Sequence, residues 1–238
     1  MKKGLAVILL LGALVASAAL WVFCAGYEAS EAAAAMMPGE TAGGAAVFMP
    51  DEIRAGLVFY PGGLVDHRAY APLMEALRER GVLCLLAEML LDLAVLDVNA
   101  ADGLTALYPE VETWIIGGHS LGGAMAAAYA AEHAEAFDAL LLLGAYSTAD
   151  LSHTDLRVLS VYGTEDGVMN RENYQKSLAM YPDDFAEVVL EGGCHAFFGD
   201  YGAQKGDGTP HITREEQIEK TADAVIALLG GMKRVPRL

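Results

Sequence analysis

The stretch Gly118-His119-Ser120-Leu121-Gly122-Gly123 places a serine between glycines, where an apolar run changes into an alanine-rich segment. Residues 114–116 before it predict a buried β-strand, and residues 124–131 after it predict a helix packed closely on a sheet. A sharp turn between the two leaves no room for β-carbons at the flanking glycines. In this context G-x-S-x-G is typical of a turn that lifts a nucleophilic serine clear of the backbone. The alternative is a structural turn without chemistry.

Length and composition fit one α/β domain. The chain has 238 residues, of which 54% are hydrophobic, enough to bury a sizeable core after a short N-terminal segment is set aside. A formal net charge of −17 argues against binding to nucleic acid, whose phosphates are neutralised by Lys and Arg. Cys24, Cys84 and Cys194 form neither a disulfide framework nor a metal-binding spacing, so no metal is expected.

Residues 1–26 are predicted to form a membrane anchor. Lys2 and Lys3 precede an uncharged apolar run over residues 4–26, close to the roughly 20 helical residues that cross a bilayer. The lysines favour a cytoplasmic N-terminus, so we expect a single-pass protein of the cell membrane with its domain outside the cytoplasm. The alternative is secretion after cleavage of a signal peptide near residues 16–18. The run stays apolar through Phe23, longer than a usual signal-peptide core, which favours the anchor.

The remaining chain divides into a predicted flexible linker, residues 27–45, and a folded domain, residues 46–238. Runs rich in Val, Leu, Ile and Phe predict strands at 46–49, 57–60, 83–86, 114–117, 140–143, 158–162 and 187–190. Helical patterns cover 70–80, 98–106, 123–133, 171–180 and 213–229. This alternation predicts a mostly parallel sheet with helices on both faces, and ligands beyond the carboxyl ends of its strands.

A serine hydroxyl needs a neighbouring base and a third group that orients the base. The strand that ends at residue 162 is followed by Glu165 and Asp166, of which Asp166 is preferred because a short side chain in a turn is better fixed. The last predicted strand is followed by Gly192-Gly193-Cys194-His195, where glycines let the loop bring the His195 ring inward. The order serine, acid, histidine is that of α/β-hydrolases. For the carboxylates, an acidic surface turn is the alternative.

Two other histidines compete with His195 as the base. His211 lies in the long loop after it and is the main rival. His119 occupies the variable position of the serine turn, where it can line a pocket but is too constrained to act as the base. His195 is therefore the predicted base.

Donors to an oxyanion are the fourth element of such a site. One is the backbone N–H of the residue after the nucleophile, here Leu121. The other is expected in Pro61-Gly62-Gly63-Leu64, which follows a predicted strand, with Gly63 as first choice and Leu64 as second. The alternative is a plain strand-to-loop turn.

Several segments together resemble the small bacterial α/β-hydrolases of the fold-5 or dienelactone-hydrolase-like type. They are residues 60–63, 69–73, 118–123, 162–166 and 193–202, and the similarity covers roughly residues 46–229. The resemblance implies an α/β-hydrolase fold of about seven strands, a Ser120–Asp166–His195 triad and no cofactor. The run 201–210 is similar to that of the subgroup, and its position after His195 suggests that it borders the pocket.

These features predict a serine hydrolase that cleaves small-molecule carboxylic esters through an acyl-enzyme. Only residues 145–155 separate two of the predicted strands, too few for a cap domain, so an open cleft is expected. Peptidase, thioesterase and acyltransferase activities on the same triad remain alternatives. A non-catalytic hydrolase-like binding domain is a further one, disfavoured because all three triad positions are filled.

Overall fold

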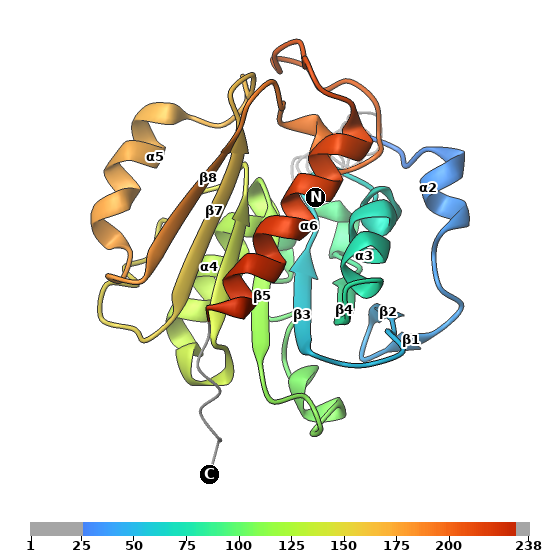
Figure 1. Ribbon diagram of the computed structural model, residues 1–238, viewed down its shortest axis with the longest axis vertical. Helices are drawn as coiled ribbons and strands as arrows, with labels where there is room; N and C mark the ends of the chain where they lie inside the picture. The colour runs from blue at the N-terminus through green and yellow to red at the C-terminus, as the bar shows by residue number, and fades with distance from the viewer. Residues whose placement is uncertain (1–25, 232–238) are drawn as a thin grey trace, which may run out of the picture.

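A single eight-stranded sheet runs through the computed structural model, which describes residues 26–231 (Figure 1). Its strand order is β1-β2-β4-β3-β5-β6-β7-β8. The strands from β4 to β8 in this order are parallel, whereas β1 and β2 join antiparallel at one edge. The predicted mostly parallel α/β fold is confirmed, with eight strands in place of about seven.

All seven predicted strands are present. The strands are β1 (Thr41–Ala42), β2 (Ala45–Phe48), β3 (Ala55–Tyr60), β4 (Val82–Ala87), β5 (Trp114–His119), β6 (Ala139–Leu143), β7 (Arg157–Gly163) and β8 (Phe185–Leu190). The additional strand, β1, has two residues, too few to give a periodic signal in the sequence. Strands β2 to β6 are buried along their whole length, as expected for a sheet covered on both faces.

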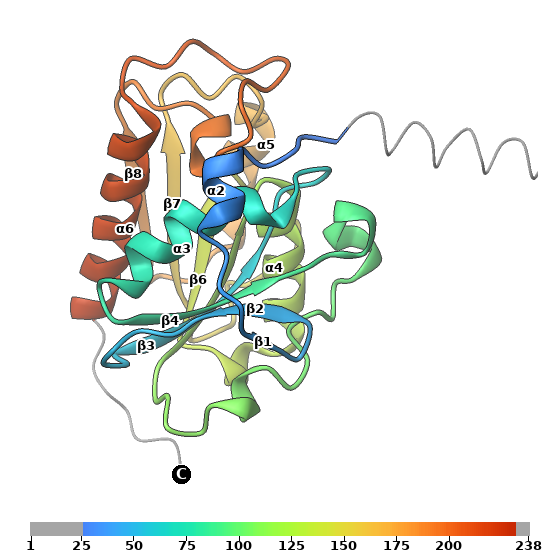
Figure 2. The ribbon, with the colours of Figure 1, turned by 90° about the vertical axis from the view of Figure 1, so that its right-hand side faces the viewer.

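Helices cover both faces of the sheet (Figures 1 and 2). They are α2 (Glu31–Ala35), α3 (Ala71–Arg78), α4 (Leu121–Glu132), α5 (Arg171–Ser177) and α6 (Arg214–Gly230). The helices α3 and α6 contact each other on one face, and α4 packs on β5 and β6 from the other. Alternate residues of β3 enter the two cores: Leu57 and Phe59 on the α3 side, and Val58 and Tyr60 on the α4 side. No cap domain is evident in residues 26–231.

The predicted helix at 98–106 is wrong. The segment forms successive turns, with a short 3-10 helix at Thr105–Leu107. The Tyr60 hydroxyl explains the difference, because it donates to Val98 O (2.7 Å) and accepts from Ala101 N (2.9 Å). In an α-helix, Val98 O would accept from Asp102 N and Ala101 N would donate to Asp97 O. Both groups are bonded to the buried Tyr60 hydroxyl instead.

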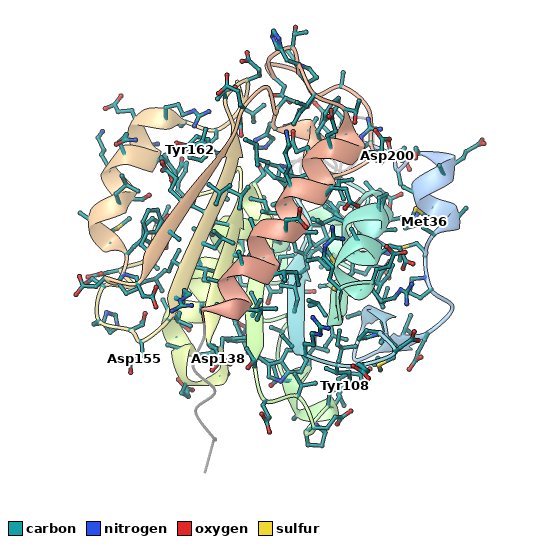
Figure 3. All side chains as sticks on the ribbon, in the orientation of Figure 1. Met36, Tyr108, Asp138, Asp155, Tyr162 and Asp200 are labelled. Carbon is teal, nitrogen blue, oxygen red and sulfur yellow. The ribbon has the colours of Figure 1, made fainter. Side chains whose placement is uncertain are left out.

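Residues 27–45, predicted as a flexible linker, are folded against the domain. Ser30 caps α2 by accepting from Ala33 N, and Ala33 is fully buried. The Ser30 hydroxyl also donates to the carboxylate of Asp200 (2.5 Å), which lies beside α2 in Figure 3. An alanine-rich composition is compatible with a packed helix as well as with a tether, so composition alone did not distinguish the two.

Within residues 26–231, no helix combines the length and apolar character needed to cross a membrane. Nearly all of the predicted anchor, residues 1–25, lies outside the described residues. The anchor, and with it the location in the cell, stays a prediction.

Candidate active site

The predicted site residues follow the carboxyl ends of four parallel strands, β3, β5, β7 and β8. Ser120 directly follows β5, Asp166 lies three residues after β7, and His195 lies five residues after β8. Gly63 lies three residues after β3, which pairs with β5. In open α/β folds, ligands bind at this side of the parallel sheet, beyond the carboxyl ends of the strands.

Ser120 sits in a sharp turn between β5 and α4. Its φ of 52° and ψ of −122° are uncommon for a residue with a side chain. The turn is closed tightly: a β-carbon at Gly118 would lie 2.5 Å from Tyr60 O, and one at Gly122 would lie 2.1 Å from Pro61 O. Only glycine fits at either position, as the sequence pattern predicted.

Asp166 and His195 form a buried pair. His195 Nδ1 lies 2.8 Å from Asp166 Oδ2, and both side chains are almost fully buried. The other carboxylate oxygen accepts from Val168 N (3.0 Å) and Met169 N (2.8 Å). Burial by itself would raise the pKa of Asp166, but the hydrogen bond and charge of His195, with these two N–H groups, hold the pKa below its usual value. The carboxylate is therefore ionised at neutral pH.

The rival residues do not take these places. Glu165 accepts from the exposed Thr164 hydroxyl. His211 is exposed, and its backbone N–H donates to Gly192 O (2.8 Å). The structure therefore pairs Asp166, not Glu165, with His195, not His211.

The His195 ring lies close to the two chain segments that flank and hold the Ser120 turn. The His195 ring centroid is 4.4 Å from that of His119, the residue before Ser120. Ser120 N donates to Leu143 O, and a β-carbon on the next residue, Gly144, would lie 2.9 Å from His195 Nδ1. His195 Nε2 is buried and has no hydrogen-bond partner in residues 26–231, so the Ser120 hydroxyl is not bonded to it. Such contacts are often long before substrate binds.

The two predicted oxyanion donors lie side by side. A β-carbon at Gly63 would be 3.2 Å from Leu121 Cβ. In the described part of the chain, neither the Gly63 N–H nor the Leu121 N–H donates a hydrogen bond. Leu64 N, the second choice, donates to Asp92 O (2.7 Å). The geometry therefore favours Gly63 over Leu64.

A buried tyrosine and histidine support this loop, and the sequence analysis gave neither of them that role. The Tyr70 hydroxyl accepts from Gly62 N (2.9 Å) and lies 2.7 Å from His119 Nδ1. The Tyr70 hydroxyl thus holds His119 through Nδ1, while His119 Nε2 is buried without a hydrogen-bond partner in residues 26–231. Burial, and then the charge of His195, lower the pKa of His119 well below its ordinary value. His119 is therefore neutral in the folded protein.

Asp207 is a third supporting residue that was not predicted from the sequence. Its carboxylate accepts from His195 N (3.0 Å), Ala196 N (2.8 Å) and Gly167 N (3.2 Å). It thereby links the loop that carries His195 to the loop that carries Asp166. The position of Asp207 in the run 201–210, typical of the resembled subgroup, was the only sequence signal.

The thiol next to the histidine is unreactive in its surroundings. Burial, and then the charge of Asp207, raise the pKa of Cys194 to about 12. Among residues 26–231, no group of three or more His, Cys, Asp or Glu side chains could hold a metal ion.

Comparisons with known proteins bear on the fold and the family. The sequence model of the alpha/beta hydrolase family matches residues 56–219. No curated protein matches the chain. Solved structures similar to it include Est1E from Butyrivibrio proteoclasticus, with 17% identity and a TM-score of 0.58 over 78% of this chain and 94% of that one.

Two further structures show the same likeness. The esterase domain of a Rhodothermus marinus protein has 17% identity and a TM-score of 0.57 over 77% of this chain and 90% of that one. Dienelactone hydrolase from Anabaena variabilis has 18% identity and a TM-score of 0.56 over 75% and 88%. At such identities the likeness establishes the fold alone.

Proposed function

The chain belongs to the alpha/beta hydrolase family, and from that premise we propose that it is a serine hydrolase that cleaves carboxylic esters. The observation that carries the proposal is the buried His195–Asp166 pair, whose imidazole ring lies 4.4 Å from that of His119, the residue before Ser120, and whose Nε2 has no hydrogen-bond partner in residues 26–231. One of the similar structures is named as an esterase domain, which supports an ester as the bond cleaved.

In the proposed first half-reaction, Ser120 Oγ attacks the ester carbonyl carbon while its proton passes to His195 Nε2. Asp166 holds the imidazole through Nδ1 and stabilises the cation that forms. The N–H groups of Leu121 and Gly63 donate to the oxyanion of the tetrahedral intermediate. The intermediate collapses to an acyl-enzyme, and the leaving alcohol takes the proton from His195.

In the second half-reaction, His195 Nε2 takes a proton from water, and the resulting hydroxide attacks the acyl-enzyme. A second tetrahedral intermediate forms in the same site. It breaks down to the carboxylic acid as His195 returns its proton to Ser120 Oγ.

The experiment compares Ser120→Ala with Ser152→Ala, which changes an exposed serine. With p-nitrophenyl acetate as substrate, we expect the first variant to lose turnover and the second to retain it, with the circular dichroism of both unchanged. Unchanged turnover in Ser120→Ala would exclude Ser120 as the nucleophile. Profiling on matched esters, thioesters and amides separates esterase activity from thioesterase, peptidase and acyltransferase activities.

We also propose that residues 1–26 anchor the protein in the cell membrane with the hydrolase domain outside the cytoplasm. The uncharged run after Lys2 and Lys3 supports this arrangement. Protease treatment of intact cells should digest the domain. In untreated cells, the protein should be found in the membrane fraction. Release of the domain into the medium would instead favour a cleaved signal peptide.

A further inference from the structure

The chain enters the folded domain at the loop that carries a proposed oxyanion donor. Tyr27 is the first residue after the apolar run 4–26. Its N–H donates to Leu64 O (2.7 Å), and Asp66 N donates to Tyr27 O (3.0 Å). Both partners follow Gly63 closely in the sequence. The end of the apolar run is therefore joined to the domain at the oxyanion loop.

The same entry point also contacts the segment that follows His195. The Tyr27 ring centroid lies 5.5 Å from that of Tyr201, and the Tyr27 hydroxyl accepts from Lys205 N (3.2 Å). Three residues later, Ser30 N donates to Asp200 O (2.8 Å). Residues 27–30 are thus fixed to segments on both sides of the site, and no free linker separates them from it.

A group of exposed apolar side chains lies beside this entry point. This leucine rim consists of four residues after β4, each more than half exposed: Leu90 (60%), Leu91 (59%), Val95 (52%) and Leu96 (53%). Asp92, in the middle of the segment, accepts from Leu64 N, so the rim is attached to the oxyanion loop. Figure 2 shows this segment projecting on the side where the described chain begins.

We propose that the leucine rim inserts into the interfacial layer of a membrane, and that the substrate is an ester carried by the lipids of that membrane. The inference depends on the proposed hydrolase function and on the anchor. Because Tyr27 follows the apolar run directly, an anchor at residues 4–26 holds the oxyanion loop at the membrane surface. Apolar side chains that are exposed to water there gain by entering the acyl boundary.

The charges near the rim specify the kind of lipid surface. Burial, and then the negative charges of Asp66, Glu28 and Glu88, raise the pKa of the Asp92 carboxyl, while His67 opposes them. The nearby Arg68 is paired with Asp66 (2.5 Å). Because the side chains around the leucine rim are mainly acidic, anionic headgroups would repel them. We therefore expect this side of the domain to bind a zwitterionic lipid surface.

The test uses the full chain in phosphatidylcholine vesicles that also hold a fluorogenic long-chain ester. The rim variant is Leu90→Ser/Leu91→Ser/Leu96→Ser, and the matched control is Met49→Ser/Val189→Thr, which changes apolar residues exposed elsewhere. We expect the rim variant to lose about tenfold in turnover of the vesicle-borne ester. Turnover of soluble p-nitrophenyl acetate should stay within about twofold in both variants.

Equal turnover of the vesicle-borne ester by the rim variant and the unchanged chain would overturn the inference. So would an unchanged chain that hydrolyses p-nitrophenyl acetate but not the vesicle-borne ester. A chain that hydrolyses neither ester, and whose Ser120 stays unlabelled by a fluorophosphonate, contradicts the proposed function itself.

A second measurement does not depend on activity. An environment-sensitive fluorophore is attached at Leu96→Cys, and for comparison at Met49→Cys, in a Cys24→Ser background. We expect a blue shift on vesicle binding at position 96 only, weaker when phosphatidylglycerol is added. The same shift in emission at both positions on vesicle binding would overturn the inference. A blue shift without vesicles would also overturn it, because it would indicate that a protein, such as a second copy of the chain, covers the rim.

Discussion

His195 Nδ1 lies 2.8 Å from Asp166 Oδ2, both side chains are buried, and His195 Nε2 has no hydrogen-bond partner within residues 26–231. The bond fixes the proton of neutral His195 on Nδ1, because the carboxylate can only accept. Nε2 is then the nitrogen able to take a proton. The proposed role of His195 as a base depends on this arrangement.

Replacing the carboxylate by an amide tests that arrangement. In Asp166→Asn, the amide N–H₂ can face Nδ1 and favour the proton on Nε2, where it blocks base catalysis. We expect kcat for p-nitrophenyl acetate to fall by about 10³–10⁴. Glu165→Gln, which changes the adjacent carboxylate, should leave kcat within about twofold. Near-normal kcat in Asp166→Asn would contradict the assigned role.

The Tyr70 hydroxyl is expected to matter for both stability and rate. Tyr70→Phe leaves Gly62 N and His119 Nδ1 without their buried partner. We expect the free energy of unfolding to fall by about 1–3 kcal/mol and kcat to fall about tenfold, since Gly62 precedes a proposed oxyanion donor. Tyr146→Phe removes a hydroxyl that lies 3.3 Å from the Asn173 amide and serves as the control. Equal effects in the two variants would show that Tyr70 has no special role.

Asp207 is predicted to act as a positioning residue. Asp207→Ala removes the acceptor shared by the histidine and acid loops. We expect kcat/KM to fall by about 10²-fold through displacement of His195. Asp207→Asn, which keeps the shape and one acceptor oxygen, should recover part of this loss. Asp150→Ala, at an exposed carboxylate, should have no effect. If Asp207→Asn were as impaired as Asp207→Ala, charge rather than position would be the cause.

The lowered pKa of His119 predicts a pH dependence of stability. Below the ordinary histidine pKa of about 6.5, the unfolded chain binds a proton at this position that the folded chain does not bind. Stability therefore falls as the pH drops below about 6.5 and is regained above it. When the pH is lowered from 7.5 to 5.5, the Tm of the unchanged chain should fall by about 2–4 °C more than the Tm of His119→Gln. Equal losses would mean that His119 is protonated in the folded protein.

The serine turn and the sheet could be predicted because local sequence decides them. Only glycine fits where Gly118 and Gly122 approach the chain after β3, and continuous apolar runs between helical segments mark buried parallel strands. Asp166 and His195 were predicted from the order serine, acid, histidine along the chain, and the structure shows that the strands before them, β7 and β8, are neighbours in the sheet.

Long-range side-chain contacts account for what the sequence did not reveal. Tyr60 reorganises residues 98–101 through a hydroxyl from a distant strand. The contacts of Tyr70 with His119, and of Asp207 with His195, join residues that only the folded topology brings together. The order in residues 27–45 likewise depends on partners such as Asp200, more than 150 positions away.

The central claim is that Ser120 is an activated nucleophile. It is tested most directly by treating the full chain with a fluorophosphonate and mapping the modified peptide by mass spectrometry. The account predicts one adduct per chain, on Ser120, that is lost in Ser120→Ala and strongly slowed in Asp166→Asn. No adduct, or an adduct on another serine that persists in Ser120→Ala, would contradict it.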